Sequence, residues 1–318
     1  MTPARVPDPG AAESGPDAAP EAPPDAALAA SAAAALAAEN GLVVLGGRPP
    51  LVSYTRQLWA RRHFAIELAR SRFRAQNEAD RLGAAWIVLL PTINAAVYGL
   101  VFGVIVKNAS RPPHFIPFLV TGVFTFAFFS GCFSDGARSI ISNRGLVRTL
   151  HFPRAVLPVA SVVQQLFALG PVVLVMCLIV KISGEPFSLR WFLIFPAYFL
   201  MALFCAGVAF FAARLTIHVR DIAQLIPFIT RLLFYVSGIF FAVSTKFSGH
   251  GLLTLALKAN PANVYITLVR DALLSRDRHL QGVHADAHTW QLGVIWGLVT
   301  VVAGFVFFWR AEGLYGRD

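Results

Sequence analysis

Charged residues are scarce in this sequence: they make up 14% of its 318 positions, whereas 56% are hydrophobic. Average soluble domains carry about a quarter charged residues, so the composition excludes an ordinary soluble protein. Acids are rarer still, with 17 Asp and Glu against 27 Lys and Arg. The sequence therefore predicts a chain whose apolar surface faces lipid.

Motifs for nucleotide hydrolysis and metal binding are also missing. No Gly-rich segment ends in Gly-Lys-Ser or Gly-Lys-Thr, the pattern that cradles nucleotide phosphates. We therefore predict that the chain is not an enzyme, does not hydrolyse ATP and has no cofactor of its own. His279, His284 and His288 are five and four residues apart. A zinc site there is the minor alternative to solvated loop residues.

Long apolar runs are abundant. Because a bilayer core of about 30 Å requires about 20 apolar residues in a helix, we predict six transmembrane helices. They are placed at 84–106, 115–133, 155–180, 191–213, 222–243 and 290–309. The runs lack the alternation of barrel strands, so the predicted fold class is an all-α integral membrane bundle. Cys132, Cys177 and Cys205 fall inside these spans and are interpreted as packing residues.

Basic residues flank the predicted spans unevenly, and this sets the predicted topology. Fifteen lie on one side: Arg56, Arg61, Arg62, Arg70, Arg72, Arg74, Arg81, Arg138, Arg144, Arg148, Arg154, Arg214, Arg220, Arg310 and Arg317. Four lie on the two short opposite loops: Lys107, Arg111, Lys181 and Arg190. The positive-inside rule places the fifteen in the cytoplasm. We predict a multi-pass protein of the cytoplasmic membrane with both termini inside, although five basic residues between 244 and 289 then lie outside.

The beginning of the chain differs from the rest. Residues 1–50 are rich in Ala and Pro with scattered acids, a composition that predicts a disordered cytoplasmic tail before a transmembrane domain over 51–318. Within Ser53–Asn77, hydrophobic residues recur every seven positions with Arg opposite, as at Trp59 and Ile66. This pattern predicts an amphipathic helix on the inner membrane surface, with a solvated arm as the alternative.

Two segments between the spans have helical patterns of their own. The segment Ser134–Arg154 interleaves apolar residues with Arg144 and Arg148. A cytoplasmic loop has no lipid to cover such residues, so we predict a protein partner there. The segment Thr245–Thr289 carries two apolar pieces too short to span, and Asn260–Pro261 suits the start of the second. We predict an outer re-entrant hairpin, or a lid, before the last span.

Arg231 lies nine residues beyond the start of the fifth predicted span, where a charge is costly unless it faces protein or water. We expect it to line a polar path and attract an anionic group such as a pyrophosphate. Pairing with an acid of a neighbouring helix, or snorkelling to the inner surface, is equally open. Aromatic rings would give passing sugars weak sliding contacts. The candidate path comprises Tyr98, Phe102, Phe128, Phe129, Arg231 and Tyr235.

Several motifs occur in a telling order: Leu82-Gly83, Trp86, Pro91, Tyr98, Val101-Phe102, Gly122, Phe128-Phe129, Asn143, Leu146-Val147, His151-Phe152-Pro153-Arg154, Pro158, Arg220-Asp221-Ile222, Asn260-Pro261 and Arg270. In this order and spacing the chain resembles the membrane subunits of type 2 ABC exporters, which move O-antigen, teichoic acid, capsule and related glycans. The likeness runs from about Ser53 to the last residue.

The resemblance implies partners and a division of roles. It implies a homodimer joined to two copies of a separate ABC ATPase, which binds ATP and Mg. It also implies a coupling helix within 139–152, an interfacial position for the amphipathic helix, and a channel at the dimer seam below the outer hairpin. The implied coupling loop comprises Asn143, Arg144, Leu146, Val147, Arg148, His151, Phe152, Pro153 and Arg154.

The implied cargo is a lipid-linked polysaccharide or its precursor. The excess of Arg over Lys indicates a GC-rich source, for which a cell-wall galactan would be a natural cargo. A drug or small-lipid exporter of the same architecture is the alternative. A membrane-embedded glycosyl or acyl transferase is a weaker one, because Asp221, Asp271, Asp277 and Asp286 are too scattered to form an acid pair. Nucleic acid is not expected as a partner, since the basic residues flank the spans.

Overall fold

The computed structural model describes residues 50–78, 82–105, 114–150, 152–219, 221–241, 251–275 and 285–312. Residues 1–49 of the predicted tail lie outside this described part of the chain. Every regular element within the described residues is helical, and the long ones coincide with apolar runs. The predicted all-α membrane class is therefore confirmed.

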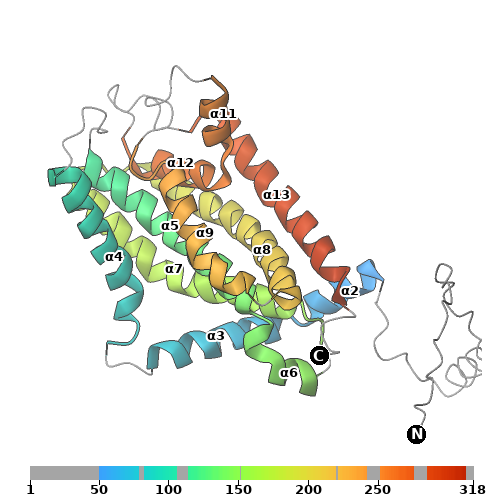
Figure 1. The fold of residues 1–318 in the computed structure, drawn as a ribbon. Helices are drawn as coiled ribbons and strands as arrows, with labels where there is room; N and C mark the ends of the chain where they lie inside the picture. Colours follow the sequence, from blue (N-terminus) through green and yellow to red (C-terminus); the bar gives the residue numbers. More distant parts are fainter. Residues whose placement is uncertain are drawn as a thin grey trace, which may run out of the picture. The chain divides into compact units, whose positions relative to one another are not determined.

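Five helices in the described ranges are long and apolar enough to cross a membrane. They are α4 (Ala85–Leu100, continued by a π-helical turn to Ile105), α5 (Phe115–Arg138), α7 (Val156–Ile182), α8 (Ile194–His218, preceded by a 3-10 turn from Leu189) and α13 (Ala287–Trp309). Helix α5 lies within the bundle (Figure 1). In its apolar 18-residue stretch 78% of the residues are buried, and α4, α7, α8 and α12 pack around it.

Helices α5 and α8 both continue beyond the predicted ends at 133 and 213. Their additional turns are more polar than the spans, which is why hydropathy did not include them. The two extensions pack against each other, and the hydroxyl of Thr216 donates to the carbonyl oxygen of Ala137 at 2.5 Å. Tertiary contact therefore lengthens both helices past the apolar run.

The fifth predicted span, 222–243, forms a shorter helix than predicted. Helix α9 covers Ile222–Val236, and its 15 residues extend about 22 Å, less than the core of about 30 Å. A turn at Ser237 and Gly238 follows, in which Gly238 has a φ of 67°, a conformation that favours glycine. In place of six long spans, the described residues contain five long helices and this shorter apolar one.

Helices α8 and α13 touch through their backbones. A Cβ atom at Gly304 would lie 2.2 Å from the carbonyl oxygen of Gly207, and one at Gly207 would lie 2.2 Å from that of Thr300. Small residues permit this close approach at crossings of membrane helices. The glycines therefore set the distance between these two helices, which lie side by side in Figure 1.

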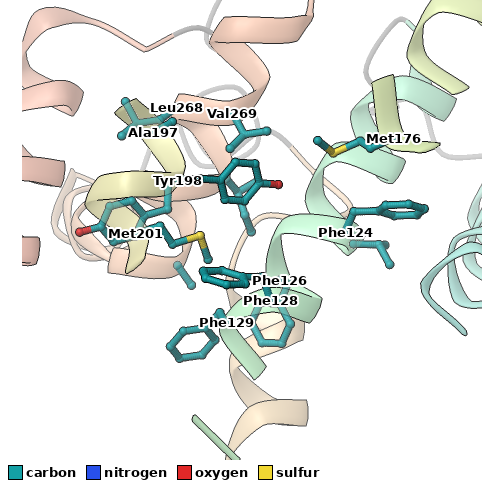
Figure 2. Packing of buried hydrophobic residues seen from close by; sticks show 14 of the residues in the cluster. Phe124, Phe126, Phe128, Phe129, Met176, Ala197, Tyr198, Met201, Leu268 and Val269 are labelled. Carbon is teal, nitrogen blue, oxygen red and sulfur yellow. The ribbon is translucent and has the colours of Figure 1, made fainter. Parts of the chain in front are cut away.

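Buried side chains form two main clusters. The main core joins α5, α7, α8 and α12, and Figure 2 shows Phe128, Met176, Tyr198 and Leu268 among its members. The second core lies near the other end of α8 and contains Tyr54, Ile140, Val147, Ala155, Leu157, Phe210, Ala213, Phe308 and Ala311. It brings together segments far apart in the sequence.

The predicted amphipathic helix is two helices, α2 (Leu51–Ala60) and α3 (Arg62–Glu78). Helix α3 packs along α7, and Ala65 and Ala69 are buried on it. Trp59, by contrast, is 71% exposed. The alanine face serves for packing, and part of the predicted apolar repeat stays on the surface, available to lipid.

The predicted hairpin forms α11 (Gly251–Ala259) and α12 (Pro261–Leu273). Asn260 caps α12, since its side-chain oxygen accepts a hydrogen bond from the N–H of Ala262 at 3.1 Å, as predicted. Helix α12 is almost wholly buried between α5, α8 and α13. A buried helix favours the re-entrant hairpin over a loose lid. In Figure 1 it lies at the end of the bundle opposite α6.

A buried arginine fastens α12 to its neighbours. The guanidinium of Arg270 donates to the carbonyl oxygens of Phe118, Gly238 and Ile239 at 3.0 to 3.1 Å and lies 3.4 Å from the centre of the Phe118 ring. Arg270 is 2% exposed, so these carbonyl groups replace its hydration. The start of α5 and the end of α9 are thereby tied to the hairpin.

Candidate functional site

A short helix follows α5 where the coupling helix was predicted. Helix α6 covers Arg144–Thr149 and lies at one end of the bundle (Figure 1). Arg144 and Arg148 are exposed and Val147 is buried. Asn143 donates its side-chain amide to the carbonyl oxygen of the α5 C-cap residue at 2.6 Å. The exposed side of α6 is therefore basic, and its first residue follows an asparagine that is hydrogen-bonded to the end of α5.

The apolar pattern of this loop is covered mostly by the protein itself. Ile140 and Val147 are 4% and 9% exposed and belong to the second core, against which Leu146 packs. Leu150 remains 49% exposed. A partner was predicted because a cytoplasmic loop would leave these apolar residues uncovered. Most of them pack instead against residues of α2, α8 and α13, so this reason holds for few of them. A partner would meet Leu150 and the two arginines.

The motif after α6, Phe152-Pro153-Arg154 in the described residues, contacts α3 and the segment after α13. The ring of Phe152 meets Phe64 of α3 edge to face at 5.4 Å, and the carbonyl oxygen of Pro153 accepts from the first N–H of α7. The backbone N–H and guanidinium of Arg154 both donate to a residue just beyond α13. His151 lies outside the described residues.

Three of the six path candidates share an aromatic cluster. The ring centres of Tyr98 lie 5.1 Å from Phe234 and 5.3 Å from Phe240. Phe240 also contacts Phe102 at 4.4 Å and Tyr235 at 6.0 Å. Phe240 follows the turn that ends α9. This turn brings Phe240 into contact with Tyr98, Phe102 and Tyr235, which the sequence pattern did not predict to lie together.

Phe128 and Phe129 have a different environment. They are 4% and 5% exposed, and their rings contact Tyr198 and Phe204 of α8 at 6.0 Å each. These contacts place both rings in the main core (Figure 2). Their assignment to a path lined by rings stays a prediction, and this packing makes both of them core residues first.

Arg231 and Tyr98 line one groove between α4, α5 and α9, with a volume of about 410 Å³. Its polar lining residues are Asn94, Ser130, Ser134, Thr230 and Arg231. Sequence reasoning missed Asn94, Ser130 and Ser134, although the last two stand four residues apart and so share one side of α5. The groove combines a cation, hydroxyls and an amide at the depth of the spans.

The side chain of Arg231 lies on the exposed side of α9. Within the described residues no carboxylate forms an ion pair with it, so the predicted pairing with a neighbouring helix is not realised there. A guanidinium at this depth is costly in lipid. The exposed side of α9 is therefore suited to a second protein surface or to water.

A second cavity of about 240 Å³ lies between α3, α4, α5 and α7. Its lining includes Gln164, Gln165 and Phe128, and it shares Leu90 and Pro91 with the groove. Helix α4 therefore lines both the groove and this second cavity. Only 11% of its spanning window is buried, which makes it the least enclosed of the five long helices.

The packing interpretation of the cysteines and the zinc alternative at the histidines have different outcomes. Cys132 and Cys205 are fully buried and Cys177 partly so, consistent with packing residues. His279 and His284 lie outside the described residues, so the zinc alternative stays untested.

A bundle of apolar helices with a polar groove at membrane depth and a short basic helix at one end defines an integral membrane protein suited to transport. The sequence pattern of the ABC-2 type transporter family matches residues 66–274, and the chain belongs to that family. The match extends from α3 to α12 and includes α6 and the groove. The resemblance drawn from the motifs is therefore confirmed at the level of the family.

Individual relatives agree with this assignment. The chain is 26% identical over 198 residues to the O-antigen export system permease protein RfbA of Myxococcus xanthus, which covers 61% of this chain and 74% of that protein. It is 25% identical over 175 residues to a protein of the same name from Klebsiella pneumoniae, covering 54% and 67%.

Proposed function

We propose that this chain is the transmembrane subunit of an ABC transporter that exports a lipid-linked polysaccharide, or its precursor, across the cytoplasmic membrane. The observation that carries the proposal is the groove containing Arg231 and Tyr98, in a chain whose relatives are named as O-antigen export permeases. A cell-wall galactan is the cargo that the composition favours.

Two copies of the chain would form the passage. The sides of α4 and α9 that flank the groove are apolar and exposed, as at Leu90, Leu225, Phe228 and Leu232, which are 54% to 68% exposed. Arg231 lies on the same helix. A second copy packed there would remove the guanidinium from lipid and enclose the two grooves between the subunits.

The groove chemistry suits an anionic, sugar-bearing amphiphile. The guanidinium of Arg231 would attract the phosphate groups of the carrier lipid, and hydroxyl and amide groups would hydrogen-bond to sugar hydroxyls. The rings of Tyr98 and Tyr235 would offer flat apolar faces to sugar C–H bonds. Such contacts are individually weak, so the glycan could slide along the groove.

The driving energy would come from a separate ATPase. Two copies of that subunit would bind ATP and Mg and press on α6 through Arg148 and Leu150. In this topology α6 and both termini are cytoplasmic, because most basic residues next to the spans then lie inside. The α11–α12 hairpin would lie at the outer exit.

Depletion of the chain in its own cells tests the proposal. We expect a lipid-linked glycan to accumulate in the inner leaflet and to disappear from the surface, as measured by mass spectrometry of extracted lipids. Restored expression should reverse both changes. Normal glycan display together with increased sensitivity to lipophilic drugs would instead identify a drug or small-lipid exporter and overturn the proposal.

A further inference from the structure

The first turn of α7 has no capping side chain of its own. Its N-cap residue is Ala155, which makes no side-chain hydrogen bond. The first N–H groups of a helix need acceptors, and Ser, Thr, Asp or Asn usually supplies one at this position. Here α7 begins within a few residues of the end of α6, so its first turn is the link between α6 and a spanning helix.

The N–H groups of Val156 and Leu157 bond to the carbonyl oxygens of Pro153 and Arg154. The N–H groups of Arg154 and Ala155, just before the helix, bond to two distant residues instead. The carboxylate of Glu312, just beyond α13, accepts from the backbone N–H of Arg154 at 3.0 Å. The hydroxyl of Tyr54, on α2, accepts from the N–H of Ala155 at 3.1 Å and donates to the other carboxylate oxygen of Glu312 at 2.7 Å. The three groups form one chain of hydrogen bonds that closes the start of α7.

This cap is buried and held from several directions. Tyr54 is 1% exposed and Glu312 is 9% exposed, and Tyr54 belongs to the second core, which also contains Val147 of α6. The guanidinium of Arg154 donates to the backbone carbonyl oxygen of Glu312. Burial raises the pKa of the Glu312 carboxyl, and the hydrogen bonds from Arg154 and Tyr54 partly offset this effect. A carboxylate at a helix N-terminus also gains from the helix dipole.

We propose that Tyr54 and Glu312 are positioning residues for coupling: they bind the N–H groups of Ala155 and Arg154 at the start of α7 and so link movement of α6 to α2 and α13. The inference rests on the proposed function, because it assigns the route by which α6 acts on the bundle. A displacement of α6 cannot tilt the start of α7 without also moving α2 and the segment after α13, since all three share the buried hydrogen bonds.

Two conservative variants test the cap in the complete complex of the chain with the ATPase that co-purifies with it. Tyr54→Phe removes the hydroxyl and retains the ring. Glu312→Gln replaces one of the two acceptor oxygens by an NH₂ donor, so it cannot accept from Tyr54 and Arg154 at two separate oxygens as Glu312 does. Tyr198→Phe is the matched control, because it removes a buried hydroxyl that contacts Thr125 at 3.1 Å in the main core.

We expect amide hydrogen exchange at Arg154 and Ala155 to become faster by about fivefold, the effect of losing one helix cap. In cells, surface display of the glycan should be lost in part, while the purified complex still assembles and hydrolyses ATP. Tyr198→Phe should change neither exchange at these residues nor export per ATP.

Unchanged exchange at Arg154 and Ala155 in both variants would overturn the cap. Faster exchange with normal export per ATP would show that the cap only stabilises the fold, which overturns the coupling role. Failure of the proposed function is distinguishable, because it appears in the wild-type arm as a complex that neither hydrolyses ATP nor displays glycan.

Discussion

Arg231 is the residue whose surroundings most constrain a mechanism. Its guanidinium is exposed on α9 and lines a groove that otherwise contains neutral polar groups and rings. Arg270 shows how the same side chain behaves as a structural residue, since three backbone carbonyl oxygens bind it inside the protein. The contrast supports a ligand-directed role for Arg231 and a fastening role for Arg270.

Replacing Arg231 tests this distinction. We expect Arg231→Ala to lower export about tenfold, because a hydrogen bond to a charged group contributes about 1.5–3 kcal/mol, with membrane insertion unchanged. Arg231→Lys should retain part of the activity. Arg74→Ala, an exposed arginine of α3, is the control and should export normally. Full export by Arg231→Ala would return this residue to a packing or snorkelling role.

At the scale of elements, backbone contact and not apolar burial alone sets the geometry of the bundle. Helices α8 and α13 meet where Gly207 and Gly304 leave no room for a Cβ atom. Helix α4, in contrast, is bordered by the groove and the second cavity. Because α8 and α13 are in close backbone contact and α4 is loosely packed, we expect α4 to move more than α8 or α13 during transport.

A glycine pair provides the measurement for this rigid contact. Gly304→Ala should lower the free energy of unfolding by about 1–3 kcal/mol, because the new methyl group forces the backbones apart. Gly99→Ala, where a Cβ would meet Leu119 at an ordinary 3.6 Å, should be neutral or stabilising by up to about 1 kcal/mol. Thermal unfolding in detergent measures both, and equal midpoints would contradict the contact.

At the scale of the whole molecule, the face formed by α4 and α9 suits neither lipid nor water throughout. Exposed apolar residues of α4 and α9 suit lipid, but Arg231 between them does not. A twofold axis beside α9 would place identical residues of two subunits together. This arrangement would enclose the grooves and explain why the polar lining faces outward from the single chain.

Cysteine cross-linking measures this arrangement. Leu232→Cys on α9 should form a disulfide-linked dimer on oxidation in membranes, since an isologous interface brings a residue near its own copy. Leu178→Cys on α7, 54% exposed on another helix, should stay monomeric on a reducing-agent-free gel. Cross-linking of Leu178→Cys without Leu232→Cys would move the interface to a different face.

The sequence predicted much of the local structure. Apolar runs located the five long helices, and Asn260–Pro261 located the start of α12. The candidate path stays a prediction, and the structure divides its rings: Tyr98, Phe102 and Tyr235 gather around Phe240, whereas Phe128 and Phe129 belong to the main core. A phenylalanine has the same apolar side chain in either place, so its type does not reveal which face of α5 is covered.

By itself, the sequence determined the membrane class, the helical form and the family, because hydropathy, backbone hydrogen bonding in lipid and motif order are properties of the chain read in order. Only the tertiary structure decided where α9 ends, which apolar residues around α6 are covered, and that Tyr54 and Glu312 cap α7. Those outcomes depend on contacts between residues far apart in the chain, as in the pair Tyr54 and Ala155, 101 positions apart, which no local pattern records.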